Sequence, residues 1–199
     1  MKPWAQWLLI GGLGLVGGLA GLLGAILFVS PGALLDAPGG QWMVRHVLGG
    51  KATLPDGRTV LAIGDEAPTL AVHDLDGVAV PLRFGDRPVL INYWASWCPP
   101  CVEEMPLLDS FARSQGPDGV IVVGIALDEA RPVRRFLDER PVGFPIFIEE
   151  SGPSDSSMLL GNARGILPYS VLIDRDGRLQ KTRLGAFGKG DLEDWTASH

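Results

Sequence analysis

The spacing of apolar and polar positions changes along the chain and predicts an alternation of strands and helices. Residues 87–94 (RPVLINYW), 119–127 (GVIVVGIAL) and 144–148 (FPIFI) are short, largely apolar runs. Such runs are typical of strands that are covered on both faces. Between them, residues 99–114 and 129–140 repeat apolar positions at helical spacing. Strands that alternate with helices predict a sheet with helices on its faces.

Shorter patterns flank this alternation. Residues 70–82 (LAVHDLDGVAVPL) alternate around a DG turn, and residues 168–185 place DRDG between two β-like runs, so both segments predict hairpins. Residues 154–162 predict a short helix and residues 189–195 a terminal one. Residues 41–63 contain a PDG turn and fit either a small hairpin or a disordered lead-in. Together the elements predict an α/β domain with a mixed central sheet and helices on both faces.

The amino-terminal end has a different pattern. Residues 3–35 contain no Asp, Glu, Lys or Arg, and residues 7–29 are densely apolar. A helix of that length would reach roughly 35 Å, which exceeds a bilayer core of about 30 Å. A secretory signal has a shorter apolar region and a small-residue cleavage site, so an uncleaved anchor is favoured. We therefore expect a transmembrane helix within residues 1–35, a lead-in at 36–63 and a catalytic domain at 64–199.

Composition and charge narrow the class of protein. The chain has 199 residues, of which 46% are hydrophobic and 20% charged, enough for one ordinary domain with a core and an appendage. Its 17 basic and 23 acidic residues give a formal net charge of -6. Nucleic-acid binding needs clustered Lys and Arg, so we exclude a nucleic-acid partner.

The candidate catalytic residues are the only two cysteines, Cys98 and Cys101, which are separated by two prolines. As a structural staple, a disulfide across so short a loop yields only about 2 kcal/mol, against about 4.7 kcal/mol for a 100-residue loop. A zinc site needs two more ligands and there is no second cysteine pair. The histidines available for it are His46, His73 and His199. Redox chemistry is the favoured interpretation, and we expect neither a metal nor a cofactor.

The predicted helix explains how such a pair would work. Cys98 stands at the amino-terminal boundary, where unpaired N–H groups and the helix dipole lower a thiol pKa below its free value of about 8.5. Cys98 is therefore expected to be exposed and to attack, and Cys101, one turn further, to be shielded and to resolve. Pro99 and Pro100 lack the N–H donors that would stabilise the thiolate further. A less stabilised reduced form makes a stronger reductant.

These motifs resemble the thioredoxin superfamily. More narrowly, GDEAPTLAVHDLDGVAVPL followed by VLINYWASWCPPCVEEMP resembles the membrane-tethered TlpA, ResA and CcmG group of extracytoplasmic thiol:disulfide oxidoreductases. The similarity covers residues 64–195, and ILPYSVLIDRDGRL falls in the order that the family has. The resemblance implies a thioredoxin-like fold. It also implies that Cys98 is the nucleophile and Cys101 the resolving thiol, with Trp97 flanking the site and Pro106 kinking the helix.

Further positions acquire a role from the same resemblance. Pro168 matches a cis-proline, and its neighbour Leu167 matches the residue that lends backbone groups to an incoming peptide. Glu104 matches an acid that this group places near the cysteines, although a solvated helix carboxylate is the alternative. Asn92 stands where cytosolic thioredoxins carry a buried Asp, so we expect Glu104 to take any proton-exchange role. Tyr169 stands where CcmG-like proteins have an acid.

The resulting hypothesis is a protein-disulfide reductase on the outer side of a bacterial cytoplasmic membrane. The pair would reduce disulfides in extracytoplasmic proteins and would be recharged by a membrane electron donor of the DsbD or CcdA type, as the resemblance implies. Two alternatives stay open. One is a disulfide-forming oxidase that uses the same cysteines, and the other is a copper-handling protein in which Cys98 and Cys101 bind Cu(I).

Overall fold

The strands form a single mixed sheet in the part of the chain that the structure, a computed structural model, describes, residues 52–197. The strands are β1 (Leu70–His73), β2 (Ala79–Leu82), β3 (Val89–Trp94), β4 (Ile121–Ala126), β5 (Ile146–Ile148), β6 (Tyr169–Ile173) and β7 (Leu179–Leu184). The helices are α4 (Pro99–Ser114), α5 (Ala130–Glu139), α6 (Ser156–Leu159) and α7 (Asp191–Ala197). The strand order is β2-β1-β5-β4-β3-β6-β7.

Strand β3 lies inside the sheet between β4 and β6, and both of these neighbours contribute to the site. It runs parallel to β4, which it reaches through α4, and antiparallel to β6. All six of its residues are buried, as the apolar run predicts. Because parallel strands end at the same edge, Trp94 at the end of β3 lies beside Ala126 at the end of β4. The loops that follow these two strands therefore meet at one edge of the sheet.

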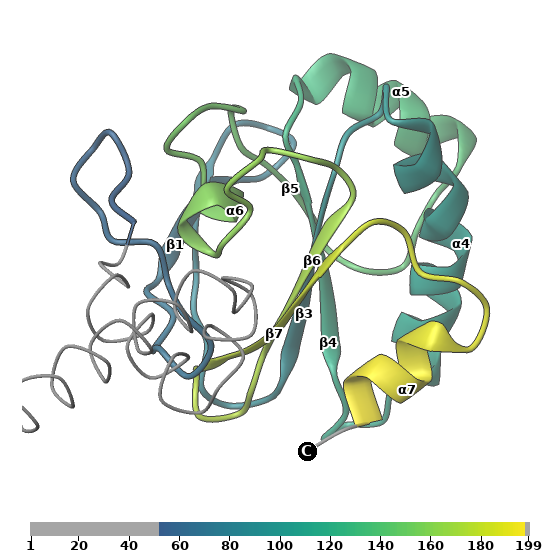
Figure 1. The fold of residues 1–199 in the computed structure, drawn as a ribbon. Coiled ribbons are helices and arrows are strands. Elements are labelled where there is room, and N and C mark those ends of the chain that lie inside the picture. Colours follow the sequence, from purple (N-terminus) through teal and green to yellow (C-terminus); the bar gives the residue numbers. More distant parts are fainter. Residues whose placement is uncertain (1–51, 198–199) are drawn as a thin grey trace, which may run out of the picture. The chain divides into compact units, whose positions relative to one another are not determined.

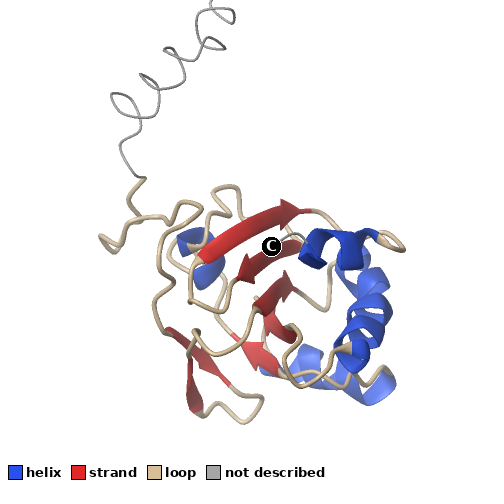
Figure 2. Ribbon diagram, turned by 90° about the horizontal axis from the view of Figure 1, so that it is seen from below, coloured by secondary structure: helices blue, strands red, loops and turns tan. Residues whose placement is uncertain are grey.

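Helices cover both faces of the sheet, as predicted (Figure 1). On one face α4, α5 and α7 enclose a core that includes Trp94, Met105 and Leu108. On the other face, Leu159 of α6 and the following Leu160 pack onto a second core. Figure 2 shows the helices on the two sides of the strands from a second direction.

Helix α4 has the bounds that its periodicity predicted. It begins at Pro99, directly after Cys98, which occupies the cap position in extended conformation. Pro99 and Pro100 fill the first two helical positions, where a missing N–H breaks no intrahelical bond. Pro106 lies inside the helix, as expected, and is exposed. The buried face of α4 is formed by Cys101, Glu104, Met105, Leu108 and Phe111.

The lead-in forms a small bridged turn, so the hairpin alternative is correct for its described part. Thr53 and Thr59 form an antiparallel bridge around the PDG turn, in which Gly57 has a φ of 85°. Leu54 is 7% exposed and belongs to the core that α6 covers. Leu61 donates its N–H to the carbonyl of Leu159, so this segment packs on the domain upstream of the expected boundary at residue 64.

The predicted anchor, residues 1–35, lies outside the described residues, as does the greater part of the predicted lead-in. Between residues 52 and 197, none of the helices combines the length and the apolar character needed to cross a bilayer.

Candidate redox site

Cys98 and Cys101 are joined by a disulfide bond in this structure. The S–S distance is 2.04 Å and the two Cα atoms are 5.3 Å apart. Cys98 is 5% exposed and Cys101 is 0% exposed. The order of exposure agrees with the predicted roles, but the expectation of an exposed Cys98 is wrong for the disulfide form. The reason is that both cysteines belong to the core cluster against which Leu167 packs.

The first turn of α4 carries few groups that would stabilise a thiolate. Cys98 has no side-chain cap hydrogen bond, and two of the first N–H groups are missing at Pro99 and Pro100. The carbonyl of Cys98 accepts the N–H of Val102 at 3.1 Å, which anchors the residue in the first helical turn. The remaining stabilisation comes from the N–H of Cys101 and the helix dipole.

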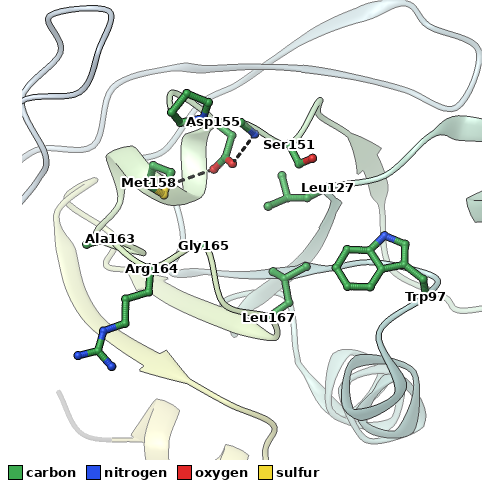
Figure 3. A pocket seen from close by; sticks show the side chains of 11 residues that line it. Trp97, Leu127, Ser151, Asp155, Met158, Ala163, Arg164, Gly165 and Leu167 are labelled. Carbon is green, nitrogen blue, oxygen red and sulfur yellow. Dashed lines mark hydrogen bonds between the residues drawn. The ribbon is translucent and has the colours of Figure 1, made fainter.

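The peptide bond between Leu167 and Pro168 is cis, as expected from the resemblance. Pro168 is buried, whereas Leu167 is half-buried and lines a cavity of about 400 Å³ together with Trp97, Leu127 and Met158. Trp97 is 68% exposed although it precedes a buried cysteine. Figure 3 shows Trp97, Leu127 and Leu167 on one side of this cavity and Met158 across it.

Glu104 is buried, so its interpretation as a solvated carboxylate is wrong. It is 3% exposed, on the face of α4 that points to the sheet. Its Oε1 accepts the side-chain amide of Asn92 at 2.9 Å, and its Oε2 accepts the backbone N–H of Phe187 at 2.8 Å. Burial raises the pKa of Glu104, and the hydrogen bonds from Phe187 and Asn92 and the charge of Arg183 oppose that rise.

Asn92 connects this carboxylate to the next strand. Its Nδ2 also lies 3.1 Å from the Oγ of Ser170, its register partner on β6. Asn92 and Ser170 are both fully buried, and the Oδ1 of Asn92 has no partner. The result is a buried polar cluster of Asn92 on β3, Glu104 on α4 and Ser170 on β6.

Sequence reasoning missed the groups that complete this cluster. Asn92 is the one polar residue inside the apolar run of β3, a signal that it needs a buried partner. Phe187 and Arg183 carry no such signal, because they reach Glu104 only through the fold. The guanidinium of Arg183 stacks on the ring of Phe187 at 4.7 Å and binds Asp191 at 2.9 Å. The β7–α7 connection thereby closes over Glu104.

Metal ligands are not gathered in the described part of the chain: between residues 52 and 197, no group of three or more His, Cys, Asp or Glu side chains is placed to hold an ion. Of the histidines weighed for zinc, His73 lies on β1, whereas His46 and His199 lie outside the described residues.

A close cysteine pair at the start of a helix, on this α/β scaffold, defines a thiol:disulfide oxidoreductase with a thioredoxin-like fold. The family model for Redoxin matches residues 62–197. The chain therefore belongs to the Redoxin family of the thioredoxin superfamily, and within it is a ResA- and CcmG-like thiol:disulfide oxidoreductase.

Individual relatives show the same similarity. A thiol-disulfide oxidoreductase ResA of Bacillus cereus is 32% identical over 136 residues, which are 67% of this chain and 76% of that protein. A crystal structure of a thioredoxin-related protein from Neisseria meningitidis serogroup B is 31% identical, with a TM-score of 0.55 over 62% of this chain and 93% of its own. StoA from Bacillus subtilis, at 24% identity and a TM-score of 0.53 over 66% of this chain and 99% of its own, supports the fold.

Proposed function

We propose that this protein is an extracytoplasmic protein-disulfide reductase that acts through Cys98 and Cys101. The observation that carries the proposal is the disulfide between these residues at the first turn of α4, with the acid Glu104 buried on the same helix. The missing donors at Pro99 and Pro100 favour the disulfide over the dithiolate, which makes the dithiol a better reductant.

The reaction is thiol–disulfide exchange in two steps. The Cys98 thiolate attacks one sulfur of a client disulfide, the client S–S bond breaks, and a mixed disulfide forms while the released client sulfur takes up a proton. Cys101 then loses its proton and attacks the sulfur of Cys98, which releases the second client sulfur as a thiolate that is also protonated. Two electrons pass from the cysteine pair to the client, and the two client sulfurs take up two protons, which replace the proton that Cys98 lost to solvent on ionisation and the proton that Cys101 loses.

Glu104 is proposed to accept the proton that Cys101 loses. The two residues are three positions apart on α4, so they share a face of the helix. A general base works best when its pKa lies near the working pH, and burial moves the pKa of Glu104 upward in that direction. The hydrogen bonds from Asn92 and Phe187 hold the carboxylate in one position.

Client binding is proposed for the surface around the cis bond. Trp97 offers an exposed apolar ring beside the cysteines, and Leu167 and Pro168 place backbone groups opposite it for an incoming extended chain. The cavity of about 400 Å³ behind Trp97 and Leu167 has a largely apolar wall, which suits a client side chain close to the disulfide.

The proposed setting is the outer side of a bacterial cytoplasmic membrane. Residues 1–35 are proposed as the anchor, residues 36–63 as the lead-in and residues 64–199 as the catalytic domain, which faces the periplasm or the cell exterior. Disulfides persist in such compartments, so a reductase there needs a source of electrons. A membrane donor of the DsbD or CcdA type would supply two electrons for each turnover.

Acid quenching and alkylation of thiols in living cells tests the direction of the reaction. A reductase that is recharged by a donor is predicted to hold Cys98 and Cys101 mostly as thiols, which gel shift after alkylation detects. A mostly oxidised pair would reject this direction and support the disulfide-forming oxidase instead.

Metal analysis tests the copper alternative. Cu(I) prefers soft thiolate ligands, so a copper-handling protein purified under reducing conditions would retain about one copper per chain through Cys98 and Cys101. The proposed reductase is expected to carry no stoichiometric copper and to keep its activity after treatment with a Cu(I) chelator.

A further inference from the structure

Ser96 and Asp128 tie together the two loops that meet at the carboxyl ends of β3 and β4. Both the backbone N–H and the hydroxyl of Ser96 donate to Oδ2 of Asp128, at 2.9 Å and 2.6 Å. The other oxygen, Oδ1, accepts the N–H of Glu129 at 2.8 Å. The two partners are 32 residues apart in the chain, and both are half-buried.

This contact holds the short segment that carries the redox pair. Ser96 lies two residues before Cys98, whose own N–H donates to the carbonyl of Ala95 at 3.1 Å. The base of the segment is fixed by the N–H of Leu127, which donates to the carbonyl of Trp94 at 2.9 Å. The turn formed by residues 94–98 is therefore secured by the side chain of Asp128, which follows β4.

The same contact lies directly beside Trp97 in the chain. Its neighbour Ser96 is held by Asp128, while the indole itself is 68% exposed. Trp97 and Leu127 line both the cavity described above and a second cavity of about 630 Å³, on whose wall Asp128 also lies. A shift of this turn would move a ring that lines both cavities.

We propose that Asp128 and Ser96 are positioning residues for the redox pair, and that their hydrogen bonds hold Cys98 close to Cys101 when the disulfide is open. The inference rests on the proposed role of the two cysteines. In the disulfide form the S–S bond itself restrains Cys98. In the dithiol form that covalent restraint is lost, and the contact between Ser96 and Asp128 keeps the effective concentration of one thiol at the other high.

The consequence is a bias toward the disulfide. Dithiothreitol reduces the pair in an exchange that converts the protein disulfide into two thiols and dithiothreitol into its cyclic disulfide, with two electrons and two protons transferred. Loosening the turn lowers the effective concentration of one thiol at the other in the dithiol form. Formation of the Cys98–Cys101 disulfide then becomes less favourable. The equilibrium of this exchange then shifts toward the reduced protein.

The experiment measures that equilibrium constant at pH 7 by thiol alkylation, for the full chain and four variants. Asp128→Asn is expected to raise the constant about tenfold, equivalent to about 30 mV toward the oxidising side. Ser96→Ala keeps the charge of Asp128 and removes only the hydroxyl bond, so a rise of about threefold is expected. Ser96→Thr retains the hydroxyl and is expected to restore the wild-type value.

Asp109→Asn is the matched control. Asp109 also accepts a backbone N–H across a long stretch of chain, from Gly143 at 2.6 Å, and it lies two turns beyond Cys101 on α4. Its substitution removes the same charge and a similar bond, and it is expected to leave the redox equilibrium unchanged. Urea unfolding of each variant reports whether the domain has folded.

The outcomes separate the possible explanations. If the equilibrium constant with dithiothreitol shifted in Asp128→Asn but not in Ser96→Ala, the effect would be one of charge alone, and the proposal would be overturned. Lower stability with an unchanged redox equilibrium in both variants would show a structural role alone and also overturn it. A wild-type protein that fails to exchange with dithiothreitol would instead refute the proposed function, a result distinguishable from either of these.

Discussion

The side-chain amide of Asn92 donates a 2.9 Å hydrogen bond to the carboxylate of Glu104 in the interior of the protein. The bond joins the interior strand β3 to helix α4, and its two residues are twelve positions apart in the chain. In the resemblance to cytosolic thioredoxins, the buried acid stands on the strand, at the position of Asn92. Here the acid is on the helix, and the strand supplies a side-chain donor that holds it.

Asn92→Asp is predicted to create two adjacent buried carboxyl groups. Like charges at this distance cannot both ionise without a large penalty, so the variant will hold a shared proton. We expect it to lose roughly 3 kcal/mol more of its unfolding free energy at pH 8 than at pH 5, corresponding to about two pKa units. Urea unfolding of the oxidised protein at both pH values measures this loss.

The double variant Asn92→Asp with Glu104→Gln is the control for that prediction. It carries one carboxyl and one amide again, with their places exchanged, so most of the additional loss at pH 8 should disappear. An equal pH-dependent loss in the single and double variants would contradict the direct pairing of Asn92 and Glu104.

Glu104→Gln is predicted to change how stability depends on pH. Burial raises the pKa of Glu104 from its ordinary value of 4.5, so the folded protein keeps this proton at pH values where the unfolded chain has lost it. The contribution of Glu104 to the stability of the wild type therefore falls as the pH rises from about 4.5 to the raised pKa, and then stays at the lower level. The loss is about 1.4 kcal/mol for each pH unit of that window.

Glutamine has no proton to lose, so the stability of Glu104→Gln relative to the wild type should increase over the same window. Urea unfolding in steps of one pH unit from 4 to 8 provides the comparison. Parallel pH profiles for the two proteins would show that the pKa of Glu104 is the same in the folded and unfolded states, against the buried placement found here.

Trp97→Ala is predicted to affect client reduction and leave stability almost unchanged. The side chain is 68% exposed, so its removal should alter the unfolding free energy by at most about 0.5 kcal/mol. The reduced variant should react with a protein disulfide about tenfold more slowly than the wild type, because it loses an aromatic contact near the cysteines. The rate at which dithiothreitol reduces the oxidised variant needs no docking surface and should stay within twofold of the wild-type rate.

Trp94→Ala is the matched comparison, since it removes the same side chain three positions earlier. Trp94 is fully buried and packs on Phe136 with ring centroids 5.1 Å apart. Its truncation should lower the unfolding free energy by about 3–5 kcal/mol. If Trp97→Ala were destabilised to a similar degree, Trp97 would be a core residue and its proposed client contact would fail.

The strands and helices of the domain could largely be predicted from sequence, because burial on both faces and helical amphipathicity leave direct patterns. The buried strand β3 and the bounds of α4, Pro99–Ser114, are the clearest cases. Residues 52–63 stayed ambiguous between hairpin and lead-in. Their order depends on packing against Leu159 on α6, which no local pattern reports.

The site was predictable where chemistry is local and unpredictable where it depends on distant contacts. The CPPC motif identified Cys98 and Cys101 directly, and the resemblance indicated the cis bond at Pro168. The burial of Glu104 was not evident, because a Glu at that helical spacing fits a solvated face as well as a buried one. The contact between Ser96 and Asp128 spans 32 residues and exists only because β3 and β4 are parallel neighbours.

Trapping of a mixed disulfide tests the central claim most directly. Reduced Cys101→Ser and Cys98→Ser variants are each mixed with a protein that contains one disulfide, and the products are separated on non-reducing gels. The account predicts a stable covalent complex through Cys98 in Cys101→Ser, and little or none in Cys98→Ser, because the shielded Cys101 cannot reach the client. A complex that forms through Cys101 and not through Cys98, or no complex with either variant, would contradict it.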